Sequence, residues 1–131
     1  MSAELDDDTR ALLDGKNFAT VATLNEDGSP HTSVVWIARD ADTVLFSTTA
    51  GRRKGRNLAR DQRISLTVTD AQNPYHSVNI SGIAELIDDP DKSLPSRLSH
   101  KYLGQDPPAE PEDVVRLIIR VAPQKVTSLS V

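Results

Sequence analysis

Cysteine is absent from this 131-residue chain, and aromatic residues make up only 4% of it. The lack of cysteine excludes a disulfide framework, thiolate chemistry and any metal site built on cysteine. The sequence also lacks a long apolar run and an apolar signal region at its acidic start, so we expect a cytoplasmic protein with no membrane partner. The net charge of −4 argues against general nucleic-acid binding.

Motifs that would identify a catalytic side chain are missing as well. The three histidines, His31, His76 and His100, have no metal-ligand spacing, so we predict that the protein has no metal site. No nucleophile-elbow, Walker or Rossmann pattern occurs in the sequence. The catalytic residues are therefore unknown at this stage.

The patterns that are present predict one domain, residues 1–131, because no repeat or linker divides the chain. Alternating apolar residues predict strands, and helical spacing with stop signals predicts three short helices. We expect strands over 18–24, 31–39, 44–46, 63–69, 77–87, 114–121 and 126–131, and helices over 5–14, 52–60 and 91–103. Residues 47–51 are expected to form a turn and residues 70–75 a loop. Gly82 is expected at a bulge, and Val115, Leu117 and Ile119 are expected to point inward.

Short turns, rather than helices, join most consecutive strands in this prediction. Asp27-Gly28 is typical of a hairpin tip, and 40–42 is a second tight turn. Such connections produce antiparallel neighbours, whereas a parallel sheet needs long crossovers. The sequence therefore predicts a mainly β, α+β fold, in which an antiparallel sheet forms a closed or nearly closed barrel with short flanking helices.

The stretch from Phe46 to Arg60 carries the clearest sign of a binding site. It contains the end of a strand, two hydroxyl groups, a glycine turn and a short basic helix. Six of the fifteen Lys and Arg residues lie between Arg52 and Arg63, although the chain is acidic overall. A helix start that points backbone N–H groups at such a turn is a good binding site for a phosphate.

A second interpretation of this stretch is purely structural. Arg52, Arg56 and Arg60 recur at i, i+4 spacing and would also form the solvated stripe of a surface helix. A phosphate pocket without a protein nucleophile makes sense when a bound cofactor supplies the chemistry. Trp36 and Tyr75 are then candidates for contact with a cofactor ring. In the structural alternative, Trp36 is an ordinary core residue and Tyr75 is an aromatic residue of the loop.

In their order and spacing, several short motifs resemble the pyridoxamine 5′-phosphate oxidase-like split-barrel superfamily, and within it the F420-dependent flavin and deazaflavin oxidoreductases. The motifs are Phe18-Ala-Thr-Val-Ala-Thr-Leu24, Asp27-Gly-Ser-Pro-His31, Val35-Trp36, Phe46-Ser-Thr48, Gly51-Arg-Arg-Lys54 with Arg56-Asn57, Arg63-Ile-Ser-Leu66, Asn73-Pro-Tyr75 and Gly82. The resemblance extends over nearly the whole chain. It implies a six-stranded antiparallel split β-barrel, of the FMN-binding type, and a homodimer with two cofactor sites at its interface.

The resemblance also implies which residues bind the cofactor. Ser47 and Thr48 would line it, and Arg53 and Lys54, beside Arg52, would bind its phosphate. Residues Thr32, Ser33, Val34 and Trp36 would run along the ring system, partly through backbone groups. Asn57 and the segment Asn73, Pro74 and Tyr75 would add further contacts, the segment reaching across from a second subunit.

We predict coenzyme F420 as the cofactor, because the extended basic run suits its phosphodiester and glutamate tail better than the single phosphate of FMN. The predicted function is hydride transfer between F420 and an unsaturated small-molecule substrate. No counterpart of the additional C-terminal segment of pyridoxamine phosphate oxidases is seen in the sequence, which argues against vitamin B6 oxidation.

Three alternatives remain open: an FMN-binding oxidoreductase of the same fold, a non-catalytic F420 carrier and, least favoured, a nucleic-acid-binding barrel.

Overall fold

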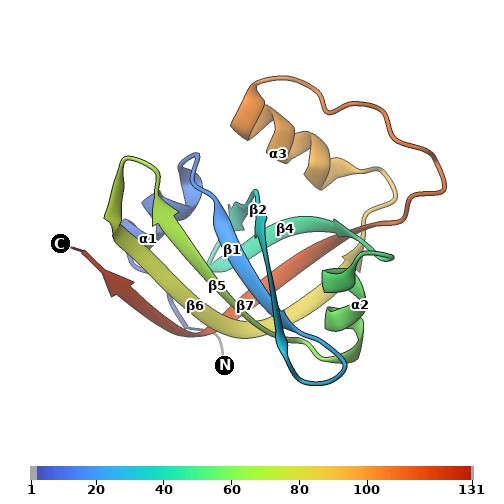
Figure 1. Ribbon diagram of the computed structural model, residues 1–131. Coiled ribbons are helices and arrows are strands. Elements are labelled where there is room, and N and C mark those ends of the chain that lie inside the picture. The colour runs from blue at the N-terminus through green and yellow to red at the C-terminus, as the bar shows by residue number, and fades with distance from the viewer. Residues whose placement is uncertain (1–2, 131) are drawn as a thin grey trace.

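A computed structural model describes residues 3–130 of the chain (Figure 1). The described residues form three helices, α1 (Asp7–Asp14), α2 (Arg53–Arg60) and α3 (Ser93–Leu103). Seven strands accompany them: β1 (Ala19–Leu24), β2 (Pro30–Val35), β3 (Ala38–Asp40), β4 (Thr43–Thr49), β5 (Arg63–Asp70), β6 (Asn73–Asp88) and β7 (Arg116–Leu129). The predicted last strand includes Val131, which lies outside the described residues.

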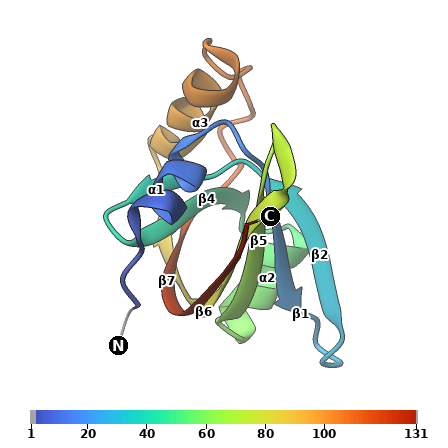
Figure 2. The ribbon, with the colours of Figure 1, turned by 90° about the vertical axis from the view of Figure 1, so that its left-hand side faces the viewer.

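All seven strands belong to one antiparallel sheet in the order β2-β1-β5-β6-β7-β4-β3. The two edge strands, β2 and β3, are separated in the chain by only Trp36 and Ile37. Since the three Cα–Cα steps from Val35 to Ala38 span at most about 11 Å, the sheet has to curl until its edges approach each other. Figure 2 shows this curled sheet. Its edges do not pair, so the predicted antiparallel split barrel is confirmed, with the short β3 as a seventh strand.

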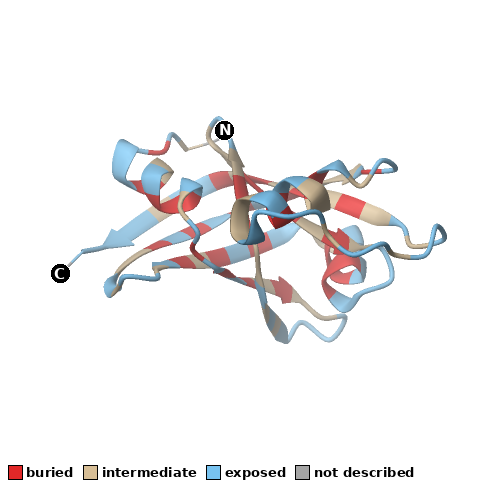
Figure 3. Ribbon diagram, turned by 90° about the horizontal axis from the view of Figure 1, so that it is seen from above, coloured by how far each residue is buried: buried red, intermediate tan, exposed pale blue. Residues whose placement is uncertain are grey.

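The main core fills the interior of the curled sheet. Alternate residues of each strand point inward, and Figure 3 shows the resulting alternation of buried and exposed segments. The inward residues include Val21, Phe46, Ile64, Leu66, Val68, Ile80, Ile119 and Val121, together with Leu12 and Leu13 of α1. A second cluster lies outside the barrel, where Leu94 and Leu98 of α3 pack against Ala38 and Leu45. Helix α3 therefore covers one outer face of the sheet.

Three predicted boundaries were wrong because long-range pairing overrides local pattern. Residues 31–39 form parts of two strands, β2 and β3, which lie at opposite edges of the sheet. The chain crosses from one edge to the other at Trp36 and Ile37. The predicted turn at 47–51 begins later, since β4 continues to Thr49 through its pairing with β7.

The expected loop at 70–75 is only a two-residue turn, and Asn73 already starts β6.

The C-terminal part differs from the prediction in a similar way. Residues 116–129 form one continuous strand along β6, so the two expected strands are one. Leu117 and Ile119 are buried as predicted, whereas Val115 is 56% exposed because it precedes the strand. The predicted bulge at Gly82 is confirmed by a register shift between Ser81 and Gly82. A Cβ at this glycine would lie 2.1 Å from the Ala122 carbonyl oxygen, which explains why no side chain fits.

No helix within residues 3–130 is long and apolar enough to span a membrane.

Candidate functional site

A cationic pocket lies where β2, β4, α2, α3 and the start of β7 approach each other. We call it the Lys54 pocket, and its cavity measures about 240 Å³. Its lining consists of Val34, Val35, Trp36, Ser47, Arg52, Lys54, Pro95, Leu98, Pro107 and Arg116. The pocket thus unites five of the thirteen predicted cofactor-binding residues: Val34, Trp36, Ser47, Arg52 and Lys54.

Lys54 is the most unusual group in this pocket, because a lysine is rarely buried without a partner. Only 9% of it is exposed, and no carboxylate in the described part of the chain lies within ion-pair distance of its ammonium group. Burial, followed by the nearby charges of Arg52 and Arg116, lowers the pKa of Lys54. A bound anion would compensate this charge and is the natural partner of the site.

Arg116 is a further cation of the pocket that the sequence did not predict. It donates two hydrogen bonds to the carboxylate of Glu110, at 3.0 and 2.9 Å, and a long one of 3.4 Å to the Ser47 hydroxyl. The Arg116 guanidinium, with a hydrogen bond from Lys92, lowers the pKa of Glu110 to about 2. Arg116 reaches the site because it pairs with Thr49 across β4 and β7, a long-range register without a local sequence signal.

Part of the lining of the Lys54 pocket is apolar. Trp36 stacks on Tyr102 with 5.1 Å between ring centroids and 7° between planes. The Tyr102 hydroxyl fixes this stack, because it accepts a hydrogen bond from the Ile37 amide at 3.2 Å and donates one to the Asn17 carbonyl at 2.5 Å. Trp36 is therefore both part of the second apolar cluster and a wall of the pocket. The arrangement fits a molecule with a flat apolar part and an anionic group.

Other predicted site residues on these strands point elsewhere. Thr48 follows Ser47 on β4, so its side chain faces the interior of the barrel, where it is fully buried. Within residues 3–130 the hydroxyl groups of Ser33 and Thr48 are buried without a hydrogen-bond partner. Thr32 is exposed on the edge strand β2. These three residues do not line the Lys54 pocket in this chain.

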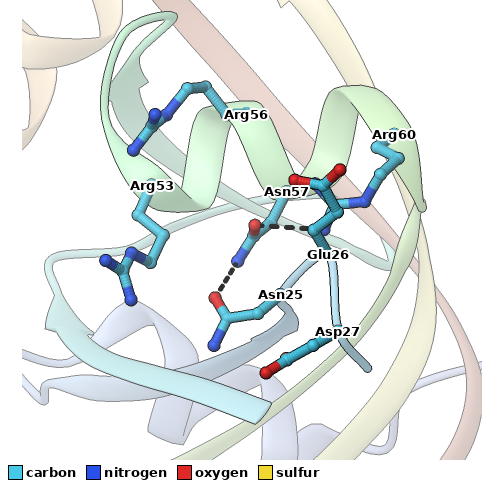
Figure 4. Close-up of a pocket in the computed structure, with 7 residues that line it drawn as sticks. All are labelled: Asn25, Glu26, Asp27, Arg53, Arg56, Asn57 and Arg60. Atoms are coloured by element: carbon cyan, nitrogen blue, oxygen red, sulfur yellow. Dashed lines mark hydrogen bonds between the residues drawn. The ribbon is translucent and has the colours of Figure 1, made fainter. Parts of the chain in front are cut away.

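Arg53 and Asn57 line a second cavity on the other side of α2 (Figure 4). We call it the hairpin pocket, and it measures about 460 Å³. Its lining is Asn25, Glu26, Asp27, Arg53, Arg56, Asn57 and Arg60. Neighbouring residues on a helix point about 100° apart. For this reason Arg53 and Lys54 serve different pockets, although the sequence grouped them in one phosphate site.

The segment Asn73, Pro74 and Tyr75 lies far from both pockets. It begins β6 beside the end of β5, whereas α2 leads into the start of β5 (Figure 1). The eight residues of β5 span roughly 25 Å. Tyr75 is 64% exposed and lines neither the Lys54 pocket nor the hairpin side of α2.

Nothing in the described range resembles a metal centre, since no group of three or more His, Cys, Asp or Glu residues is placed to hold an ion.

Comparison with known proteins places this geometry in a family. The family model of pyridoxamine 5′-phosphate oxidase matches residues 5–130. The pyridoxine/pyridoxamine 5′-phosphate oxidase of Vibrio vulnificus is 35% identical over 81 residues, which are 58% of this chain and 36% of that protein. The chain thus spans about a third of the length of the curated relatives it matches.

Solved structures resemble the chain over almost its entire length. An F420 reductase is 29% identical and superposes with a TM-score of 0.84, covering 94% of this chain and 98% of that one. A conserved hypothetical protein from Mycobacterium tuberculosis, 21% identical with a TM-score of 0.79, covers 98% and 86% of the two chains and shares the fold. Because the family model covers nearly all of the chain, this protein belongs to the pyridoxamine 5′-phosphate oxidase family, as its sequence motifs predicted.

Proposed function

We propose that the protein is an oxidoreductase that binds coenzyme F420 in the Lys54 pocket and reduces an unsaturated organic substrate. The observation that carries the proposal is the convergence of Arg52, Lys54 and Arg116 on one pocket that Trp36 also lines. The likeness to an F420 reductase, at 29% identity, supports F420 rather than FMN as the cofactor.

The donor set of the pocket suits a phosphate group. Lys54 and Arg52 supply charge at the start of α2, and Arg116 adds a guanidinium from β7. The first backbone N–H groups of α2 have no side-chain cap within the described residues, because the N-cap residue Arg52 makes no such hydrogen bond. Unsatisfied N–H groups at a helix start and nearby cations favour phosphate oxygens. Ser47 offers a hydroxyl at the same place.

The apolar wall is suited to the ring system. Val34, Val35 and Trp36 would pack against it, and β2 is an edge strand with outward backbone groups that can hydrogen-bond to a ligand. Reduced F420, when bound, would provide the hydride for the reduction, and the accompanying proton would come from solvent or from a side chain of the site. The residues of the chain would anchor the phosphate and orient the ring.

A homodimer would complete the site. The cavity of about 240 Å³ is smaller than the roughly 300–1,000 Å³ usual for ligand pockets. Val34 at its edge is 66% exposed, and Tyr75, predicted as a cofactor contact, is 64% exposed and distant from the pocket of its own chain. A second copy would cover Val34 and bring its own Asn73–Tyr75 segment to the cofactor.

Parallel titrations with F420 and FMN test the proposal. We expect Lys54→Met to weaken F420 binding about 10- to 100-fold, because it removes a charge-assisted hydrogen bond worth roughly 1.5–3 kcal/mol. The matched control is Lys16→Gln, which removes an exposed lysine charge on the turn after α1.

Each outcome of these titrations has a defined meaning. Preferential binding of FMN, also weakened by Lys54→Met, would assign the same pocket to a flavin. Tight F420 binding without reduction of any unsaturated acceptor would identify a carrier. If neither cofactor binds, or if Lys54→Met and Lys16→Gln bind alike, the Lys54 pocket is not the cofactor site.

The lowered pKa of Lys54 gives a pH signature. Lys54 binds an anion only when protonated, so affinity falls as pH rises through the pKa of the free protein. A bound phosphate raises that pKa again, so binding at alkaline pH takes up a proton. Titration calorimetry in two buffers of different ionisation enthalpy measures this uptake, which Lys54→Met should abolish. Equal heats of binding in both buffers for the wild-type protein would contradict proton uptake by Lys54.

A further inference from the structure

The crossover between β2 and β3 carries a residue of the Lys54 pocket on a very short segment. Only Trp36 and Ile37 connect the two edge strands, and neither residue takes part in strand pairing. Ile37 is fully buried, whereas Trp36 is half-buried and lines the pocket. Because the sheet does not hold these two residues, the orientation of Trp36 has to be set by contacts from outside the sheet.

Two consecutive residues near the end of α3, Lys101 and Tyr102, supply these contacts, and we call them the α3 clamp. The Lys101 ammonium group donates a hydrogen bond to the Ile37 carbonyl at 2.7 Å, and the Tyr102 hydroxyl accepts one from the Ile37 amide at 3.2 Å. Both backbone polar groups of Ile37 are thus satisfied by α3. The ring of Tyr102 also stacks on the indole of Trp36. The α3 clamp therefore holds the crossover by its backbone and by its ring.

The α3 clamp is itself anchored to other elements of the fold. Lys101 also donates to the Leu13 carbonyl at 2.8 Å, in the last turn of α1. Tyr102 donates to the Asn17 carbonyl, and the side chain of Asn17 accepts a hydrogen bond from the Ala71 amide at 2.8 Å. The crossover therefore shares one hydrogen-bonded network with α1, α3 and the turn between β5 and β6, so little order has to be gained there when a ligand binds.

The half-buried ammonium group of Lys101 has no carboxylate within ion-pair distance in the described part of the chain. Burial lowers the pKa of Lys101 to about 8, and the charge of Asp14 partly offsets this shift, so the ammonium form prevails at neutral pH. Two carbonyl oxygens and the ring of Tyr102, whose centroid lies 4.9 Å from Nζ, replace a counter-ion. Capping of α1 would need only the bond to Leu13. The bond to Ile37 indicates a second role.

We propose that Lys101 and Tyr102 are positioning residues, which hold Trp36 in the orientation that packs against the ring of a ligand in the Lys54 pocket. This role rests on the proposed function, because it requires a cofactor with a ring. Neither residue of the α3 clamp lines the pocket, so both act through Trp36. Orientation matters for hydride transfer, since the reacting atoms have to be held about 3–3.5 Å apart and small displacements are costly.

Titrations with F420 and with inorganic phosphate separate the effect on the ring from the effect on the anionic group. Lys101→Met and Tyr102→Phe should each weaken F420 binding about three- to tenfold, because Trp36 is no longer held in place before binding. Both variants should leave the affinity for inorganic phosphate unchanged, since the cations of the Lys54 pocket are not altered. The matched control is Lys16→Met, which replaces an exposed lysine and should resemble the wild type in both titrations.

The fluorescence of Trp36, the single tryptophan, reports on the crossover in the free protein. Quenching of this fluorescence by acrylamide should increase in both variants, because a loosened crossover exposes the indole. A merely structural role would lower Tm but would leave quenching and F420 affinity, measured well below Tm, at their wild-type values. Tyr102→Phe keeps the stacked ring and removes only the hydroxyl group, so it still decides the question if Lys101→Met folds poorly.

The results distinguish this inference from the proposed function. If the wild-type protein does not bind F420 but quenching increases in both variants, the proposed function fails and the hold of the α3 clamp on Trp36 stands. If the wild-type protein binds F420 and both variants match Lys16→Met in F420 affinity, the positioning role is overturned and the proposed function stands. Equal losses of F420 and phosphate affinity would also overturn it, because they would indicate a general distortion of the pocket rather than a displaced Trp36.

Discussion

Replacing Gly55 by alanine is a sharp test of how α2 is positioned. Gly55 is buried in α2, and a Cβ there would lie 2.4 Å from the carbonyl oxygen of Thr49 and 3.4 Å from Cα of Ala50. Both neighbours belong to the backbone at the end of β4. The glycine therefore allows α2 to pack directly on the strand that carries Ser47.

The magnitude follows from two opposing effects. Alanine favours a helix over glycine by about 1 kcal/mol, so in an isolated helix this substitution would stabilise. Here an ordinary contact begins near 3.4 Å, so α2 or β4 has to move by about 1 Å to accept the methyl group. Overpacking of this kind costs roughly 1–3 kcal/mol. We expect a net loss of about 1–2 kcal/mol, which lowers Tm by roughly 3–10 °C.

Thermal and urea unfolding measure this loss, with Gly51→Ala as the matched control. A Cβ at Gly51 would meet nothing within 4 Å, so the control should be as stable as the wild type or slightly more so. Gly55→Ala should also weaken phosphate binding, because it displaces the neighbouring Lys54. Equal or higher stability of Gly55→Ala, together with unchanged anion affinity, would refute this account of α2.

Two further predictions concern stability. Hydrogen bonds that the His76 ring donates to the carboxylates of Asp70 and Asp8 raise the pKa of His76 above its usual 6.5, so their contribution to stability is present below about pH 6.5 and is lost as pH rises through the folded pKa. His76→Gln should therefore be less stable than the wild type near pH 6 and match it more closely in alkaline buffer; a pH-independent difference would contradict this. Buried Asp89 accepts backbone hydrogen bonds at 2.9 and 3.0 Å at the start of α3, so Asp89→Ala should lose about 1–3 kcal/mol in urea unfolding, and exposed Asp91→Ala should not.

The elements of the fold were largely predictable because their signals are local. Alternation in Ile64, Leu66 and Val68 identified β5, and Asp27-Gly28 identified the hairpin tip, where Gly28 has a φ of 86°. Strand ends were less predictable, because they depend on pairing partners. The break at Trp36 has no local signal: it exists because the sheet curls and the chain crosses from one edge to the other.

The candidate site was predictable only in part, for a similar reason. Lys54 and Ser47 follow each other closely in sequence, so a strand–turn–helix pattern was enough to bring them together. Arg116 comes from the far end of the chain and joins them through the register of β7. The separation of Arg53 from Lys54 depends on the rotation of α2 about its axis, which is fixed by the packing of Gly55 on Thr49.

The most direct test of the central claim is a crystal structure of the complex with F420. The account predicts a dimer in which the cofactor phosphate lies within hydrogen-bond distance of Lys54 and Arg116 and the deazaflavin ring packs against Trp36. A phosphate bound between Arg53 and Arg56 instead, or a cofactor that leaves Lys54 without an anionic partner, would contradict it.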